Sequence, residues 1–358
     1  MLKTVVKVSS IAVVAYAAII AILSFDTPQR CLMFLHWVRF PLHPKFDTPE
    51  YFGFGHNHGR NIKIQTSDNV TLGAWHFVPK NYYDKHQLRE QADVDEQVFD
   101  EALADPLYDT IIYFHGNALD RAAPWRVDLY KQILNRFGKV NIVTIDYRGF
   151  GDSESSPSEF GLALDAHATL KWLNDRNVPN SRVILIGHSL GTGVATTLAY
   201  DMALSDKPAK ALILNAGYSS MATLIFEYNV LPFLPLLAPI KRIPDLEQWL
   251  LSKLNHKFDS LSRIGYIQCP LLIIYGTADM EIPIVHSQRL FQRVISGLKN
   301  TSIEQLEKNH EISRTVVPNE AIVYQSKNSK VVMVELKHAH HNNVGYFDYT
   351  YQSMKDIL

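Results

Sequence analysis

The chain has 358 residues, of which 47% are hydrophobic and 20% are charged, a balance typical of folded globular proteins. Its formal net charge of −1 gives no overall field that would attract nucleic acid. The two cysteines, Cys31 and Cys269, are too few for a disulfide framework. The length suits one large α/β domain, a class that often exceeds ~250 residues.

The N-terminus differs in composition from the rest. Residues 8–25 contain no charged side chain, and as a helix they would extend ~27 Å, close to the hydrocarbon thickness of a membrane. We therefore predict residues 1–45 as a transmembrane anchor with its juxtamembrane segment. A cleaved signal peptide and a buried helix are the alternatives. Residues 31–41 are aromatic and either lie at the membrane interface or pack on the domain.

From residue 46 onward, strand and helix patterns alternate. A β-hairpin is expected at residues 61–77, and a polar surface insertion at 84–105. The expected strands after these are 110–114, 140–145, 182–186, 211–214, 271–275 and 331–336, and the expected helices are 125–137, 159–175 and 189–204. Such alternation predicts a doubly wound, mostly parallel sheet.

One apolar segment interrupts this alternation. Residues 218–256 carry Pro232, Pro235, Pro239 and Pro244 among Leu, Phe and Ile. The segment either covers the core as a long excursion or forms a lid over an apolar pocket. Both interpretations remain open at this point.

The strongest chemical motif is Gly187-His-Ser189-Leu190-Gly191, a Gly-x-Ser-x-Gly pattern between an expected strand and an expected helix. In that context the serine occupies a sharp turn that exposes its hydroxyl, and the glycines let the strand and the helix approach closely. The backbone N–H of Leu190 would then point to where a tetrahedral oxyanion forms. Ser189 is the predicted nucleophile, with a purely structural turn as the alternative.

Two other strand ends carry groups that a serine nucleophile needs. His115-Gly-Asn117-Ala118 follows the strand at 110–114, where the second oxyanion amide is expected, and we assign it to Asn117 ahead of Ala118. An ordinary β-to-α turn is the alternative. Asp279 follows the strand at 271–275, where an acid can orient a histidine. Glu281 fits that position less well because it lies two residues deeper in the loop.

Three histidines follow the strand at 331–336: His338, His340 and His341. The chain order of serine, aspartate and histidine is that of α/β-hydrolases. A zinc site built from these histidines has little support, because no second cluster of ligands is paired with them.

The chain resembles the membrane-anchored α/β-hydrolase-domain lipases that act on monoacylglycerols and lysophosphatidylserine. The motifs that carry the resemblance are Leu72-Gly-Ala-Trp-His-Phe-Val-Pro79, Tyr113-Phe-His-Gly-Asn-Ala118, Asp146-Tyr-Arg-Gly-Phe-Gly-Asp-Ser153 and Gly187-His-Ser-Leu-Gly-Thr-Gly-Val-Ala-Thr196. The similarity extends from about residue 20 to the C-terminus. It implies an α/β-hydrolase fold and serine esterase activity on single-chain lipids, with a catalytic domain in the lumen of the endoplasmic reticulum or outside the cell.

The resemblance also distinguishes among the histidines. The family's loop places the catalytic histidine four residues before a Gly-aromatic pair, here Gly345-Tyr346, which implies His341. The chain departs from the family in two places. About 25 residues near 305–330 lengthen the interval between acid and histidine, and the lid region matches poorly. The headgroup of the lipid therefore does not follow from the resemblance.

We predict a single-pass membrane serine hydrolase with an α/β-hydrolase domain at 46–358, using Ser189, Asp279 and His341 with the amides of Asn117 and Leu190. It would need no cofactor or metal, and its partners would be a lipid substrate and the bilayer. An acyl-protein thioesterase and a non-catalytic lipid-binding scaffold are the alternatives. No oligomeric state follows from the sequence.

Three short signals bear on the compartment. Asn69-Val-Thr71 and Asn300-Thr-Ser302 have the form of glycosylation acceptors. The chain ends in Lys355-Asp-Ile-Leu358, one residue different from a retention tetrapeptide. Together with the resemblance, they favour the lumenal side of the endoplasmic reticulum.

Overall fold

A computed structural model describes residues 2–228, 237–299 and 301–358. Within these ranges, ten strands form one sheet in the order β1-β2-β4-β3-β5-β6-β7-β10-β9-β8. The strands are β1 (Gly59–Gln65), β2 (Thr71–Phe77), β3 (Asp109–Phe114), β4 (Val140–Ile145), β5 (Val183–His188), β6 (Ala211–Asn215), β7 (Leu271–Gly276), β8 (Ile312–Val317), β9 (Ala321–Ser326) and β10 (Val331–Leu336).

The centre of the sheet is parallel, as predicted. Strands β4, β3, β5, β6, β7 and β10 pair in parallel, whereas the pairs at both edges are antiparallel. Every residue of β4, β5, β6 and β7 is buried. Continuous apolar runs suit these strands because helices cover both faces of a parallel sheet.

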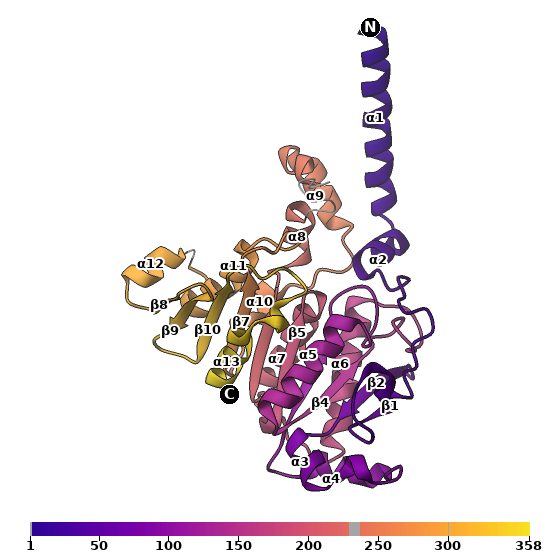
Figure 1. Cartoon of the computed structure of the whole chain (residues 1–358). Coiled ribbons are helices and arrows are strands. Elements are labelled where there is room, and N and C mark those ends of the chain that lie inside the picture. The colour runs from indigo at the N-terminus through magenta and orange to yellow at the C-terminus, as the bar shows by residue number, and fades with distance from the viewer. Residues whose placement is uncertain (1, 229–236, 300) are drawn as a thin grey trace.

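The helices cover the sheet in two layers (Figure 1). On one face, α6 (Glu159–Asn174), α7 (Leu190–Leu204) and α11 (Val285–Ser296) contribute Leu162, Val194 and Leu290 to the larger core cluster. On the other face, α5 (Pro124–Phe137) and α13 (Asp348–Ile357) contribute Tyr130 and Met354 to a second cluster. The two clusters confirm the doubly wound architecture.

Two segments that the sequence marks as insertions form regular structure. Residues 84–105 contain α4 (Glu96–Ala104), whose buried Phe99 and Ala102 belong to a small core cluster separate from the main ones, so this segment packs locally as well as presenting a polar surface. The interval at 305–330 contains the end of α12 (Ile303–Lys308) and the β8–β9 hairpin. That hairpin extends the sheet antiparallel to β10.

The N-terminal residues form two helices joined by a sharp bend. Helix α1 (Leu2–Leu23) projects away from the sheet (Figure 1), and α2 (Asp26–Phe34) turns back toward it. Within the described residues, no single helix meets the length and hydropathy required to cross a membrane. The segments Val14–Leu23 and Asp26–Phe34 meet that requirement only together, as a pair bent by 89°.

Helix α2 and the residues after it pack on the sheet domain. Phe34 is completely buried, and its ring lies edge-on to Phe258 at 6.2 Å between centroids. The backbone oxygens of Phe34 and Val38 accept hydrogen bonds from the amides of Ala118 and Leu119, at 2.9 and 3.2 Å. Residues 26–38, which the sequence groups with the anchor, therefore make contacts with the sheet domain.

The apolar segment at 218–256 lies next to the N-terminal helices (Figure 1). It contains α8 (Met221–Glu227), the short 3-10 helix η4 (Ala238–Arg242) and α9 (Pro244–Ser252). Ile20 of α1 packs in a cluster with buried side chains from each of these three elements. The predicted positions of Pro232 and Pro235 lie outside the described residues.

Candidate active site

Ser189 lies on the turn between β5 and α7 in a strained backbone conformation, with φ 51° and ψ −119°. Gly187 and Gly191 have no room for a side chain, because backbone atoms of neighbouring segments lie close to their Cα atoms. A Cβ atom on Gly187 would lie 2.5 Å from the oxygen of Gly191, and one on Gly191 would lie 2.0 Å from the oxygen of Phe114. The sequence thus forces a sharp turn that presents one hydroxyl. Among the described residues, that hydroxyl has no hydrogen-bond partner.

Asp279 and His341 are joined by a hydrogen bond. His341 Nδ1 lies 2.8 Å from Asp279 Oδ2, and the aspartate side chain is fully buried. Its other oxygen accepts the backbone N–H groups of Glu281 and Ile282 at 2.9 and 3.0 Å. The loops after β7 and β10 meet because these strands are parallel neighbours in the sheet. An aspartate held in this way fixes the imidazole ring, with Nδ1 as donor and Nε2 directed elsewhere.

The other two histidines do not contact Asp279. His340 is exposed, and its Nδ1 lies 2.9 Å from the oxygen of Ala278. His338 is also exposed and has a positive φ of 66°. Within the described parts of the chain, no three His, Cys, Asp or Glu residues are grouped as metal ligands.

Charge around His341 favours its protonated form. Burial alone lowers the pKa of His341, but the hydrogen bond and charge of Asp279, together with the charge of Glu281, raise it above its ordinary value of 6.5. Glu281 Oε2 lies 3.7 Å from His341 Nε2. Glu281 was weighed in the sequence only as the less suitable acid. The structure places it on the opposite side of the imidazole from Asp279.

His188, the residue before Ser189, supports the histidine loop. Its Nε2 lies 2.9 Å from the backbone oxygen of His341. Burial and the proximity of His341 lower the pKa of His188 to about 3, so the ring is neutral and donates one hydrogen bond through Nε2. The sequence analysis missed this role, although His188 occupies the variable position of the Gly-x-Ser-x-Gly motif.

Two backbone amides near Ser189 are available to an oxyanion. Leu190 is the first residue of α7, so its N–H has no partner within the helix. In the described structure the N–H of Asn117 is likewise without a hydrogen-bond partner, and Asn117 and Leu190 line one cavity with Ser189. The N–H of Ala118, the second candidate, is already bonded to Phe34.

One buried arginine fixes the loop that carries Asn117, here called the HGN loop (residues 115–120). Arg126 of α5 is 1% exposed, and its guanidinium donates to the backbone oxygens of Gly116, Asn117, Ala118 and Asp120 at 2.7–3.2 Å. In a trans peptide the C=O and the following N–H point in opposite directions. Because the oxygen of Gly116 is turned toward Arg126, the N–H of Asn117 is turned away from it.

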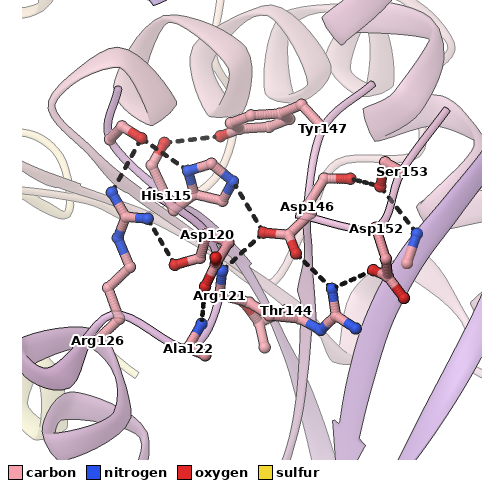
Figure 2. A network of polar contacts seen from close by, with 12 residues as sticks. His115, Asp120, Arg121, Ala122, Arg126, Thr144, Asp146, Tyr147, Asp152 and Ser153 are labelled. Atoms are coloured by element: carbon pink, nitrogen blue, oxygen red, sulfur yellow. Dashed lines mark hydrogen bonds and ion pairs between the residues drawn. The ribbon is translucent and has the colours of Figure 1, made fainter. Parts of the chain in front are cut away.

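A network of buried polar contacts lies beneath the HGN loop (Figure 2). His115 Nε2 lies 3.5 Å from Asp146 Oδ1, and Arg121 pairs with both Asp146 and Asp152. The hydroxyl of Tyr147 donates to the backbone oxygen of His115 at 2.9 Å. These contacts tie the ends of β3 and β4 together, and the loop therefore has a rigid base.

An apolar cavity of about 380 Å³ opens at Ser189. Met33 of α2, Leu224 of α8 and Leu250 of α9 are among its lining residues, so three elements outside the sheet form its walls. Polar groups are few and lie near Ser189, among them Asn117 and Glu281. The shape and lining suit an elongated apolar ligand whose reactive group reaches Ser189.

Comparison with known sequences shows which proteins this chain is similar to. Lysophosphatidylserine lipase ABHD12 of Rattus norvegicus is 34% identical over 266 residues, which are 74% of this chain and 63% of the relative. Protein ABHD12B of Homo sapiens is 31% identical over 246 residues, covering 68% of this chain and 64% of that protein. The match thus spans less than two thirds of the length of these curated relatives.

Comparison with solved structures supports the fold. The esterase Pf2001 of Pyrococcus furiosus aligns with a TM-score of 0.53 at 18% identity, over 89% of this chain and 95% of that one. An alpha-beta hydrolase of Vibrio vulnificus aligns with a TM-score of 0.55 at 15% identity, over 84% and 80%. Residues 111–312 match the alpha/beta hydrolase family, and this match fits the sheet order and the serine turn. The chain belongs to the alpha/beta hydrolase family.

Proposed function

We propose that this protein is a membrane-associated serine esterase that cleaves carboxylic esters of single-chain lipids, such as monoacylglycerols or lysophospholipids. The observation that carries the proposal is the position of Ser189. Its side chain, on a strained turn, lines an apolar cavity of about 380 Å³ that is large enough for an acyl chain. The similarity to lysophosphatidylserine lipases supports the same substrate class.

The proposed reaction is acyl transfer in two steps. The Ser189 hydroxyl attacks the ester carbonyl while His341 Nε2 accepts its proton, and Asp279 stabilises the resulting imidazolium. The amides of Asn117 and Leu190 bind the oxyanion, each contributing about 3 kcal/mol. His341 then protonates the leaving alcohol. Water, activated by the same histidine, releases the fatty acid from Ser189.

Membrane attachment is part of the proposal. The bent pair Val14–Leu23 and Asp26–Phe34 has the length and composition of a span, and α1 extends beyond the sheet domain. We place the catalytic domain in the lumen of the endoplasmic reticulum, in keeping with the acceptor triplets of the sequence. Because α1 packs against the segment at 218–256, that segment would cover the cavity on the membrane side.

The test is labelling and hydrolysis with a Ser189→Ala variant. The wild-type protein should react with a fluorophosphonate probe and hydrolyse a monoacylglycerol, and Ser189→Ala should do neither while keeping its circular dichroism spectrum. A folded Ser189→Ala protein that is still labelled would move the nucleophile elsewhere. A wild-type protein that binds lipid but is never labelled would indicate a binding scaffold instead.

A second comparison separates the lipase from a thioesterase. The same protein is assayed on a lysolipid in bilayers and on an acylated peptide thioester of the same chain length. The proposal requires higher kcat/KM on the lipid, because the cavity walls come from elements that lie beside the predicted span. Equal turnover of both substrates would remove the preference for lipase.

A further inference from the structure

The cavity at Ser189 contains one formal charge. Among its described lining residues, only Glu281 is charged, and the others are apolar or neutral polar groups. Residues 229–236, the part of the apolar segment at 218–256 that lies outside the described ranges, include no charged residue in the sequence. No Lys or Arg among the described residues forms an ion pair with Glu281. The ion-pair partner of Glu281 in this part of the structure is His341, and while His341 is neutral, as it must be to accept the serine proton, the carboxylate charge is uncompensated.

Glu281 lies where the alcohol part of an ester must pass. In the proposed reaction, His341 Nε2 delivers a proton to the leaving alcohol, so the alcohol oxygen has to come within hydrogen-bond distance of that nitrogen. Glu281 Oε2 is 3.7 Å from the same nitrogen and 3.5 Å from the hydroxyl of Tyr228. The group attached to the alcohol oxygen consequently lies within a few ångströms of a carboxylate.

The apolar lining limits where the acyl chain can go. Most of the lining is apolar and includes Leu32 and Met33 of α2, Leu224 and Ile225 of α8 and Leu250 of α9. A fatty acyl chain gains by burying its methylene groups against such walls. The acyl part thus packs on the apolar side chains, and the alcohol part, which must reach His341 Nε2, lies beside the carboxylate.

We infer that Glu281 selects substrates by the charge of their alcohol group, favouring uncharged or cationic groups over a phosphate next to the scissile ester. The inference rests on the proposed esterase function. Two unit charges of like sign about 6 Å apart in a partly solvated site repel enough to change kcat/KM by roughly tenfold. Because the Glu281 side chain is 40% exposed, added salt should weaken this selection.

The test uses three esters with one acyl chain and different alcohols. Octanoyl choline is cationic, monooctanoyl glycerol is neutral, and octanoyl glycerol 3-phosphate is anionic. For the wild-type protein, kcat/KM should be highest for the first two and about tenfold lower for the phosphate ester. Glu281→Gln should bring the ratio of phosphate to glycerol ester close to one, and Glu281→Lys should invert the preference between choline and phosphate.

The ratio isolates the charge effect from other roles of Glu281. Removing this carboxylate also changes the pKa of His341, but that change affects all three esters alike and cancels in the ratio. Glu247→Gln, which removes the same charge from α9 outside the cavity lining, is the matched control and should keep the wild-type ratio.

Each outcome has one meaning. A wild-type protein that hydrolyses none of the esters removes the proposed function, and the charge selection with it. Hydrolysis of the glycerol ester with a ratio that stays within twofold between wild type and Glu281→Gln leaves the esterase intact and overturns the role of Glu281. If Glu247→Gln changes the ratio of phosphate to glycerol ester as much as Glu281→Gln does, the selection comes from the net charge of the protein and not from Glu281.

Discussion

Arg126 is a buried cation whose partners are backbone oxygens. Among the described residues it forms no ion pair, and its guanidinium instead joins four carbonyl groups of the HGN loop. A charge in such a place is expensive unless hydrogen bonds compensate for lost hydration. Three successive carbonyls of this loop face Arg126, and two of the opposite amides are bonded to Phe34 and Val38. Of the three amides that follow these carbonyls, the one of Asn117 is left for a ligand.

We expect Arg126→Met to lower kcat on an ester by about 10²-fold with a small change in KM, because a misaligned Asn117 amide affects the oxyanion and not the bound ester. A transition-state analogue such as a boronic acid should lose affinity in proportion to kcat. Arg182→Met is the matched control, since Arg182 also donates to several backbone oxygens but far from Ser189. Equal kcat losses in both variants would reduce Arg126 to a structural role.

The three histidines after β10 give a second prediction. His341→Ala should lower kcat by at least ~10³-fold, as the loss of a triad member does, whereas His340→Ala and His338→Ala should cost less than ~10-fold. The reason is the 2.8 Å contact of His341 with Asp279, which neither neighbour makes. All three variants are measured on one short-chain ester. Near-wild-type activity of His341→Ala would contradict the assignment.

Asp120 makes the stability of the HGN loop depend on pH. Burial, and next the charge of Asp146, raise the pKa of Asp120 from 3.8 to about 7. Since the folded state holds this proton more tightly than the unfolded state, stability falls as the pH rises from about 4 to about 7 and stays reduced above that. Asp120→Asn keeps an oxygen for the N–H of Ala122 and removes the charge.

We therefore expect Asp120→Asn to raise Tm by about 2–5 °C at pH 8 and to leave it nearly unchanged at pH 4. Thermal unfolding followed by circular dichroism at both pH values measures the difference. Asp206→Asn, at an exposed turn, is the control and should show no such pH dependence. A Tm gain of equal size at both pH values would mean that the charge of Asp120 is not its cause.

At this scale the sequence identified residues that belong to motifs. Ser189 and Asp279 were chosen because a strand end restricts where the next side chain lies, and the structure brings Asp279 to His341. Arg126 and His188 were not assigned, because their roles depend on which backbone oxygens a side chain reaches across the fold. That information is absent from local pattern. The sequence analysis considered Glu281 only as an alternative to Asp279. Its position beside His341 Nε2 depends on the conformation of the loop after β7, which a local pattern does not give.

Helix α2 is the element whose role differs most from its sequence appearance. It carries Met33 into the cavity wall, and its end supplies the oxygen of Phe34 to the HGN loop. Gln29 donates to the backbone oxygens of Leu23 and Lys253, which ties α2 to the apolar segment at 218–256. The anchor region thus contributes directly to the candidate site.

Shortened chains test this contribution. A chain that begins at residue 24 should keep most of its activity on a soluble short-chain ester, because α2 remains. A chain that begins at residue 46 should lose activity by ~10²-fold or more, since the amides of Ala118 and Leu119 lose their partners and the cavity loses a wall. Circular dichroism establishes that both chains fold. Equal activity of the two would show that α2 does not shape the site.

The elements of the sheet were the most predictable part of the fold. The ranges of β4 and β10 coincide with the expected strands, because buried parallel strands appear as short apolar runs bounded by turn residues. The β8–β9 hairpin was missed. Strand β8 is mostly exposed and β9 is only partly buried, so no apolar run distinguishes them from a polar insertion. The bend at Ser24 was missed as well, because hydropathy alone continues through it.

At the scale of the whole molecule, the side of the membrane can be tested through Asn69. This residue lies in the exposed turn between β1 and β2, where an acceptor triplet is accessible. In microsomes we expect a mobility shift that endoglycosidase H removes and that Asn69→Gln reduces. Asn300 is the second acceptor by sequence and lies outside the described residues, so the double variant with Asn300→Gln is included. A protein that is not glycosylated and is digested by protease added outside the microsomes would place the domain in the cytosol.

The global arrangement was predictable to the level of family and layer order, because the motifs fix consecutive strand ends. The relation of the anchor to the cavity was not. It depends on contacts between residues more than 200 positions apart, such as Gln29 with Lys253. A pattern read along the chain gives no measure of such contacts.

In the proposed membrane-attached esterase, the 89° bend between α1 and α2 would set the route by which a substrate arrives. If α1 follows the bilayer normal, α2 lies parallel to the membrane plane, at the depth of the lipid headgroups. The cavity wall that contains Leu32 and Met33 would then face the headgroup region of the adjoining leaflet. A lipid would enter by lateral diffusion within the leaflet and would never cross water. Turnover would accordingly follow the mole fraction of substrate in the bilayer and be insensitive to its bulk concentration.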